Sequence, residues 1–89
     1  MKNEIPKQKS GVQTRYIGGE SLLIDGEKSY AINPSAAFIW NLCDGAHTFE
    51  MIVKVVHIEF TFPNGIDVYG EIKRILLDFH EKDLLEGID

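Results

Sequence analysis

One cysteine and three histidines are the most reactive side chains of this 89-residue chain. Cys43 has no second Cys or His at a spacing typical of metal sites, and it falls within an apolar segment, which favours a buried thiol over a nucleophile. His47, His57 and His80 are scattered and form no HExxH motif. We therefore expect no catalytic residue, no metal and no cofactor, and hence no enzyme.

Three short runs of strand-forming residues begin at residue 12 and read VQTRYI, ESLLID and KSYAIN, separated by GG and GE. Glycine in these pairs permits the positive φ that tight hairpins need, so the runs predict a three-stranded antiparallel meander. The pairs lack the surrounding sequence of a phosphate-binding loop. The third strand, Lys28 to Ile32, has no following strand, so one of its edges is expected to be open.

From Asn33 onward the apolar residues recur at spacings of three and four, which predicts helices. The first is expected over about 34–44, with Asn33 as its N-cap. A second helix, capped by Thr48, is expected to run to about residue 60, and the last from residue 66 or 67 to residue 82. Trp40 falls on the apolar side of the first helix and is expected to be a packing residue.

The last helix has two distinct flanks beside its core stripe, which comprises Val68, Tyr69, Ile72, Ile75, Leu76 and Phe79. Leu77 falls on one flank together with Lys73 and His80. The opposite flank is mostly acidic and is expected to face solvent; it carries Asp67, Glu71, Asp78 and Lys82.

Length and charge limit the classes of function. A chain of this size forms one domain, expected over 11–89 after a flexible arm at 1–10. The net charge is −5, and residues 67–82 hold three basic against four acidic groups. Three strands and three helices also fit a winged-helix DNA-binding regulator, which is our alternative, but duplex binding needs basic surfaces, so we expect no nucleic-acid partner. No signal peptide or apolar span is evident, which predicts a cytoplasmic protein with no membrane partner.

The segment INPSAAFIWNLCDG, together with the residues after it, resembles the PqqD family pattern "LN.(S/T)AA.IW.L.DG..T...I". The matching residues are Ile32, Asn33, Ser35, Ala36, Ala37, Ile39, Trp40, Leu42, Asp44, Gly45, Thr48 and Ile52. The tail resembles the closing pattern "V..FL..L...GLL", although Asp83 stands where the family usually has Gly. The resemblance extends from Val12 to Leu85.

The resemblance implies an α+β, winged helix-turn-helix-like fold, with a three-stranded antiparallel sheet followed by a three-helix bundle. PqqD-like proteins are RiPP recognition elements: they bind the leader segment of a ribosomally made precursor peptide as an added strand and present it to a modifying enzyme. That enzyme would be a radical SAM protein or a leader protease, in PQQ-type or lasso-type biosynthesis.

The implied peptide contacts lie on the third strand and on the last helix. They are Lys28, Ser29, Tyr30, Ala31, Ile32, Tyr69, Ile72, Lys73, Leu76, Leu77 and His80. Ile72 and Leu76 also fit the core, whereas Leu77 is not needed by the core stripe and is the stronger candidate. Lys73 would pair with an acidic leader residue, although such a lysine is usually only solvated.

Overall fold

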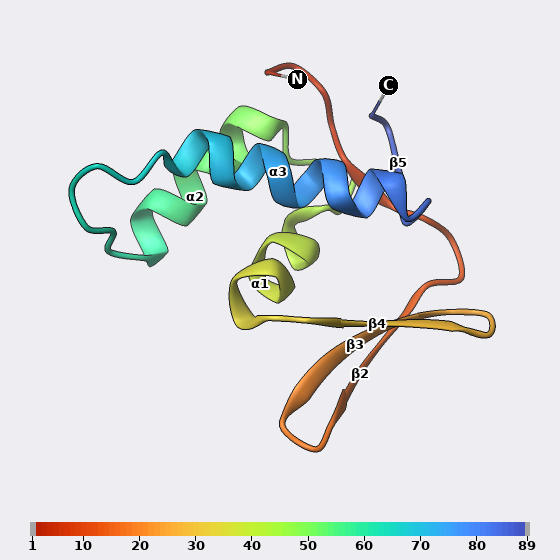
Figure 1. The fold of residues 1–89 in the computed structure, drawn as a ribbon. Helices are drawn as coiled ribbons and strands as arrows, with labels where there is room; N and C mark the ends of the chain where they lie inside the picture. The colour runs from red at the N-terminus through yellow and green to blue at the C-terminus, as the bar shows by residue number, and fades with distance from the viewer. Residues whose placement is uncertain (1, 89) are drawn as a thin grey trace.

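The computed structural model describes residues 2–88 and has an α+β fold in which a three-stranded antiparallel sheet precedes three helices (Figure 1). The sheet has the order β2-β3-β4, and a separate two-stranded sheet pairs β1 with β5. This confirms the predicted fold class. The elements are β1 (Lys7–Gln8), β2 (Gln13–Ile17), β3 (Glu20–Asp25), β4 (Lys28–Ile32), α1 (Pro34–Leu42), α2 (Phe49–Glu59), α3 (Val68–Glu81) and β5 (Leu85–Glu86).

Two glycine-containing turns shape the sheet. Gly18 and Gly19 have φ of 61° and 82°, as a type I′ hairpin between β2 and β3 requires. Between β3 and β4 only the first turn residue, Gly26, has positive φ, at 62°, which is the pattern of a type II′ hairpin. The backbone twist of both turn types matches the right-handed twist of the flanking strands. The predicted meander therefore forms.

Side-chain caps set the helix starts. The Asn33 side chain accepts a hydrogen bond from the Ala36 backbone N–H at 2.7 Å, and Thr48 caps α2 in the same way. The Asp67 carboxylate accepts from the Gly70 N–H, so α3 begins at Val68. The first helix ends at Leu42, two residues before the predicted end, because Cys43 already has non-helical backbone angles.

Trp40 joins the sheet to the helices. Its side chain is 1% exposed, its ring packs edge-on against Phe79 of α3 at 5.2 Å, and its Nε1–H donates to the Thr14 hydroxyl on β2 at 3.3 Å. The expectation that Trp40 is a packing residue is therefore confirmed. Leu23 of β3 is also fully buried, so the sheet contributes one face to a core made mainly by the helices.

The core stripe of α3 is narrower than predicted. Val68, Ile72, Leu76 and Phe79 are buried, and Ile75 is half-buried. Tyr69 is instead 48% exposed, because it lies at the edge of the stripe, where its ring contacts Phe49 of α2 at 4.8 Å. After the helix, Asp83 has a φ of 59°, the left-handed conformation in which the family pattern has glycine.

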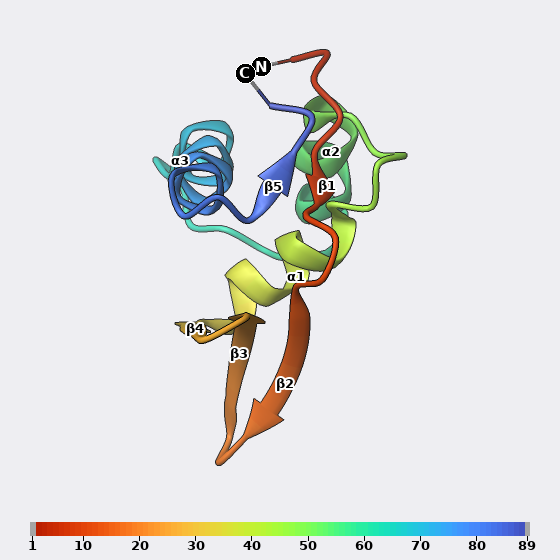
Figure 2. The same cartoon turned by 90° about the vertical axis from the view of Figure 1, so that its right-hand side faces the viewer.

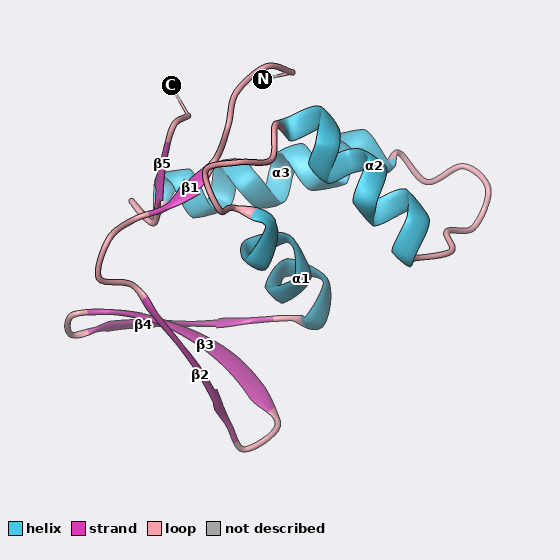
Figure 3. Ribbon diagram, turned by 180° about the vertical axis from the view of Figure 1, so that it is seen from behind, coloured by secondary structure: helices cyan, strands magenta, loops and turns pink. Residues whose placement is uncertain are grey.

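The N-terminal arm has a defined path, contrary to the expectation that the fold starts near Gly11. Its β1 strand pairs with β5, so the first and last strands lie side by side (Figure 2). The carbonyl of Glu4 accepts from Phe49 N–H and that of Pro6 from Gly45 N–H, each within 3.0 Å. Seen from behind, the arm crosses the connection between α1 and α2 (Figure 3). The arm is therefore hydrogen-bonded both to the connection between α1 and α2 and to β5.

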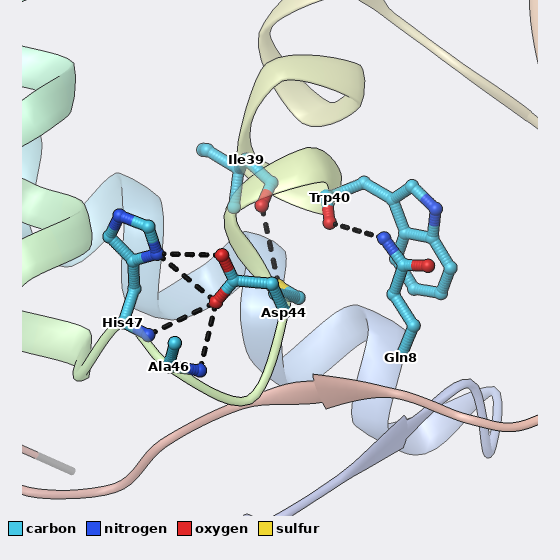
Figure 4. Close-up of polar contacts among 7 residues, drawn as sticks. Gln8, Ile39, Trp40, Asp44, Ala46 and His47 are labelled. Atoms are coloured by element: carbon cyan, nitrogen blue, oxygen red, sulfur yellow. Dashed lines mark hydrogen bonds and ion pairs between the residues drawn. The ribbon is translucent and has the colours of Figure 1, made fainter.

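Asp44 organises the turn between α1 and α2 (Figure 4). Its Oδ1 accepts from the backbone N–H groups of Ala46 and His47 at 2.9 and 3.1 Å, while His47 Nδ1 lies 2.9 Å from Oδ2. The His47 side chain and these N–H groups lower the pKa of Asp44 from 3.8 to about 2. The turn is thus held by an ionised carboxylate.

Candidate functional site

The free edge of β4 is the first part of the candidate site. Within residues 2–88, β3 is the only strand to which the backbone of these five residues is hydrogen-bonded. Ser29 and Ala31 are exposed on the outer face of the sheet, whereas Tyr30 and Ile32 are half-buried against the core. An unpaired edge of this kind is a template for another strand.

Hairpin geometry identifies the backbone groups that this edge offers. Asp25 and Lys28 close the turn and form a hydrogen-bonded pair. Along an antiparallel ladder, hydrogen-bonded pairs alternate with pairs that are not hydrogen-bonded to each other. Tyr30 and Ile32 therefore bond to β3. The N–H and C=O groups of Ser29 and Ala31 point away from β3, toward the open edge.

Helix α3 runs beside this edge in the opposite direction (Figure 1). At the middle of β4, Lys82 Nζ lies 5.7 Å from the centre of the Tyr30 ring. Asp78 accepts a short hydrogen bond from Lys82 at 2.6 Å, and Ile75 is half-buried one turn further along. We call this surface the β4–α3 face; it consists of Tyr30, Ile32, Ile75, Asp78 and Lys82.

The structure does not bring the other predicted flank of α3 to β4. At about 100° per residue, Lys73, Leu77 and His80 lie roughly 140° to 160° around the helix from Ile75. Lys73 and Leu77 instead border a shallow hollow, which Asp78 also lines but no β4 residue does. The flank expected to face solvent, with Asp78 and Lys82, is the one beside the strand.

The remaining predicted α3 contacts are also placed elsewhere. Ile72 and Leu76 are 2% and 0% exposed and belong to the core. Tyr69 contacts Phe49 on the α2 side of the helix. Of the predicted residues, only the strand Lys28–Ile32 lies at the open edge, while the α3 residues nearest to it, such as Lys82, were not among the predicted contacts.

An apolar hollow of about 320 Å³ continues from the end of β4. Asn33 and Ser35 line it just beyond the strand, and Ile75 lines it from α3. The segment 60–66 closes it with Phe60, Phe62 and Ile66. Because Asn33 directly follows Ile32 and lines the hollow, the hollow lies next to the end of β4.

The reactive side chains are poorly placed for chemistry. Cys43 is buried, and burial, with a smaller contribution from Asp44, raises the pKa of its thiol to about 12. A thiol of this kind is protonated near neutral pH and is a poor nucleophile. Within the described part of the chain, no group of three or more His, Cys, Asp or Glu side chains could hold a metal ion.

Charges on α3 are largely compensated. Arg74 donates to Glu71 at 2.9 Å and Lys82 pairs with Asp78, so two of the three basic groups near this helix already contact carboxylates. This arrangement gives no support to a duplex-binding surface. No helix within residues 2–88 is long and apolar enough to cross a membrane.

Comparison with known proteins agrees with this architecture. The family model described as coenzyme PQQ synthesis protein D (PqqD) matches residues 20–85, from β3 to β5. The chain belongs to the PqqD family. Among curated proteins, none matches it.

Two solved structures share the fold of this PqqD-family chain. TbiB1 in complex with the TbiA(beta) leader peptide is 22% identical, with a TM-score of 0.77 over 93% of this chain and 98% of that one. The PqqD truncation of Methylobacterium extorquens PqqCD, a stand-alone RiPP recognition element, is also 22% identical. Its TM-score is 0.72 over 91% of this chain and 87% of that one. These similarities establish the fold.

Proposed function

We propose that this protein binds the leader segment of a ribosomally made precursor peptide as an added fourth strand on β4. The observation that carries the proposal is the open β4 edge beside α3, with the outward backbone groups of Ser29 and Ala31. Backbone hydrogen bonds would supply affinity, and side chains of the β4–α3 face would supply specificity. Membership of the PqqD family supports this function, as does the leader peptide bound to TbiB1.

The helix side of the proposed site consists of Ile75, Asp78 and Lys82. Leader side chains that point inward from the added strand would meet the apolar surface of Tyr30, Ile32 and Ile75. The Asp78–Lys82 pair borders this surface and leaves it close to neutral. We therefore expect apolar leader residues there, rather than the acidic partner expected for Lys73.

The protein itself would be non-catalytic and would present the peptide to a separate modifying enzyme in the cytoplasm. The buried, protonated Cys43 supports this, because it removes the strongest candidate nucleophile. The precursor should keep its mass when it is incubated with this protein alone. A mass change without the partner enzyme would contradict the non-catalytic proposal.

Calorimetric titration tests the binding function. The probes are the N-terminal segments of any short peptides encoded beside the gene for this protein, with sequence-scrambled versions as controls. Saturable binding of the natural leader, with weak or absent binding of the scrambled one, is the expected result. Equal affinity for both peptides, or tight salt-sensitive binding to duplex DNA instead, would contradict the proposal.

A further inference from the structure

Lys9, in the N-terminal arm, joins the sheet to the end of α3. Its Nζ lies 3.1 Å from Oδ2 of Asp25, the last residue of β3, and 3.4 Å from Oδ2 of Asp83, two residues after α3. The side chains of Lys9 and Asp25 are 35% and 25% exposed, so solvent screens this pair less than a fully exposed one. Within residues 2–88, no other ion pair joins the sheet to α3 or to the turn after it.

The end of β4 that Lys9 tethers has few other contacts. The turn before it is exposed at Gly26 and Glu27, and so are Lys28 and Ser29 at the start of the strand. At its other end β4 leads into α1 and carries the half-buried Ile32, which packs against the core. Core packing therefore holds the end of β4 more firmly than its start.

Backbone hydrogen bonds fix the position of Lys9. Its N–H donates to the Leu84 carbonyl at 2.9 Å, and its own carbonyl accepts from the Val12 N–H at 3.3 Å, just before β2 begins. The arm thus runs from the segment after α3 into the sheet, on the side where the turn between β3 and β4 lies (Figure 1). From this junction the Lys9 side chain reaches both carboxylates.

The backbone of Asp83 indicates that its carboxylate has a role. Asp83 is the only non-glycine residue with positive φ among residues 2–88, at 59°. Glycine adopts this left-handed conformation without steric cost, whereas a Cβ destabilises it. A strained position that keeps its side chain is evidence for a contact made by that side chain, and the ion-pair partner of Asp83 is Lys9.

We propose that Lys9 is a positioning residue for the peptide site: by pairing with Asp25 and Asp83, it sets the spacing between the start of β4 and the end of α3. The inference rests on the proposed strand addition, because the added strand must fit beside both elements. It gives a role in binding to an arm that contributes no residue to the β4–α3 face. Since exposed ion pairs contribute modestly, loss of the Lys9 charge should weaken leader binding about threefold to fivefold.

Two substitutions of Lys9 and a matched control test this role. Lys9→Met keeps the aliphatic stem and removes the charge, whereas Lys9→Arg keeps the charge. Lys7→Met makes the same change of charge on the same arm, and the exposed Lys7 has no ion pair within residues 2–88. Calorimetry with a leader that binds wild type should show the threefold to fivefold loss for Lys9→Met alone. Wild-type affinity in Lys9→Met, or an equal loss in Lys7→Met, would overturn the proposal.

The contact between Lys82 and Tyr30 reports the spacing in the absence of peptide. Because the Lys82 ammonium lies over the Tyr30 ring, the ring current should move the ε-methylene protons of Lys82 upfield in wild type. That upfield shift should shrink in Lys9→Met and persist in Lys9→Arg and Lys7→Met. An unchanged shift in Lys9→Met would show that Lys9 does not hold the two elements together.

Asp83→Gly separates positioning from simple stabilisation. Glycine relieves the left-handed backbone, so the free energy of unfolding should be unchanged or higher, while leader binding weakens about twofold through loss of one ion pair. If affinity instead follows stability across all these variants, Lys9 acts only through stability and the positioning role is wrong. If leaders bind wild type and every variant equally, this inference alone fails. If no leader binds wild type, the proposed function fails with it.

Discussion

The sheet has two open edges, β2 and β4, and they differ in what lies beside them. Each has five residues and a row of outward backbone groups. Every residue of β2 is exposed and Arg15 stands at its centre, whereas β4 has α3 alongside and half-buried apolar residues at Tyr30 and Ile32. Charged residues on an edge discourage pairing. We therefore propose β4 rather than β2 as the binding edge, because only β4 has a second element beside it that can supply side-chain contacts.

Trp40→Ala tests the packing of the sheet against the helices, on which both edges depend. It should have the largest effect. The indole contacts Thr14 of β2 and Phe79 of α3, so its loss should lower the free energy of unfolding by about 3 to 5 kcal/mol. Denaturant unfolding measures this change. A variant that keeps wild-type stability but loses leader binding would contradict the packing role.

Ala31→Pro should weaken leader binding at least about tenfold. It removes an outward N–H that β3 does not use and places a ring on the open edge, so the fold should tolerate it. Tyr16→Pro is the matched control, because Tyr16 occupies an outward position on β2 and is 76% exposed. It should leave the affinity unchanged in calorimetry. Loss of binding in Tyr16→Pro alone would move the site to β2.

A matched pair of substitutions, with smaller expected effects on leader binding, distinguishes which flank of α3 contacts the peptide. Ile75 and Leu77 are both half-buried, but only Ile75 belongs to the β4–α3 face. Ile75→Ala should weaken leader binding about threefold to tenfold through lost apolar contact, with Leu77→Ala near the wild-type affinity. The reverse ranking would support the flank expected from the sequence.

A still smaller effect is expected far from both edges, at Asp44. Its folded pKa of about 2 lies below its ordinary 3.8, so the ionised carboxylate stabilises the fold above about pH 4, and this contribution is lost as pH falls toward 2. Asp44→Asn should therefore be less stable than wild type at neutral pH, and the difference should vanish near pH 2. Thermal unfolding across this range measures it; a difference independent of pH would contradict the role of the charge.

Periodicity was sufficient to predict the sheet, the three helices and the helix caps at Asn33 and Thr48, because these depend on local spacing and local hydrogen bonds. It could not predict β1 and β5, which are two residues each and pair across almost the whole chain. Nor could it choose between the flanks of α3. A helical pattern fixes angles around its own axis, while the side that meets β4 depends on tertiary packing. The hollow likewise requires three helices and a loop to meet.

Amide shift mapping with the natural leader tests the central claim most directly. Backbone amides of Lys28–Ile32 should shift on titration, with smaller shifts at Ile75 and Lys82, and those of Gln13–Ile17 should stay unchanged. Shifts along β2 with β4 unaffected, or binding without any shift in the sheet, would contradict strand addition at β4.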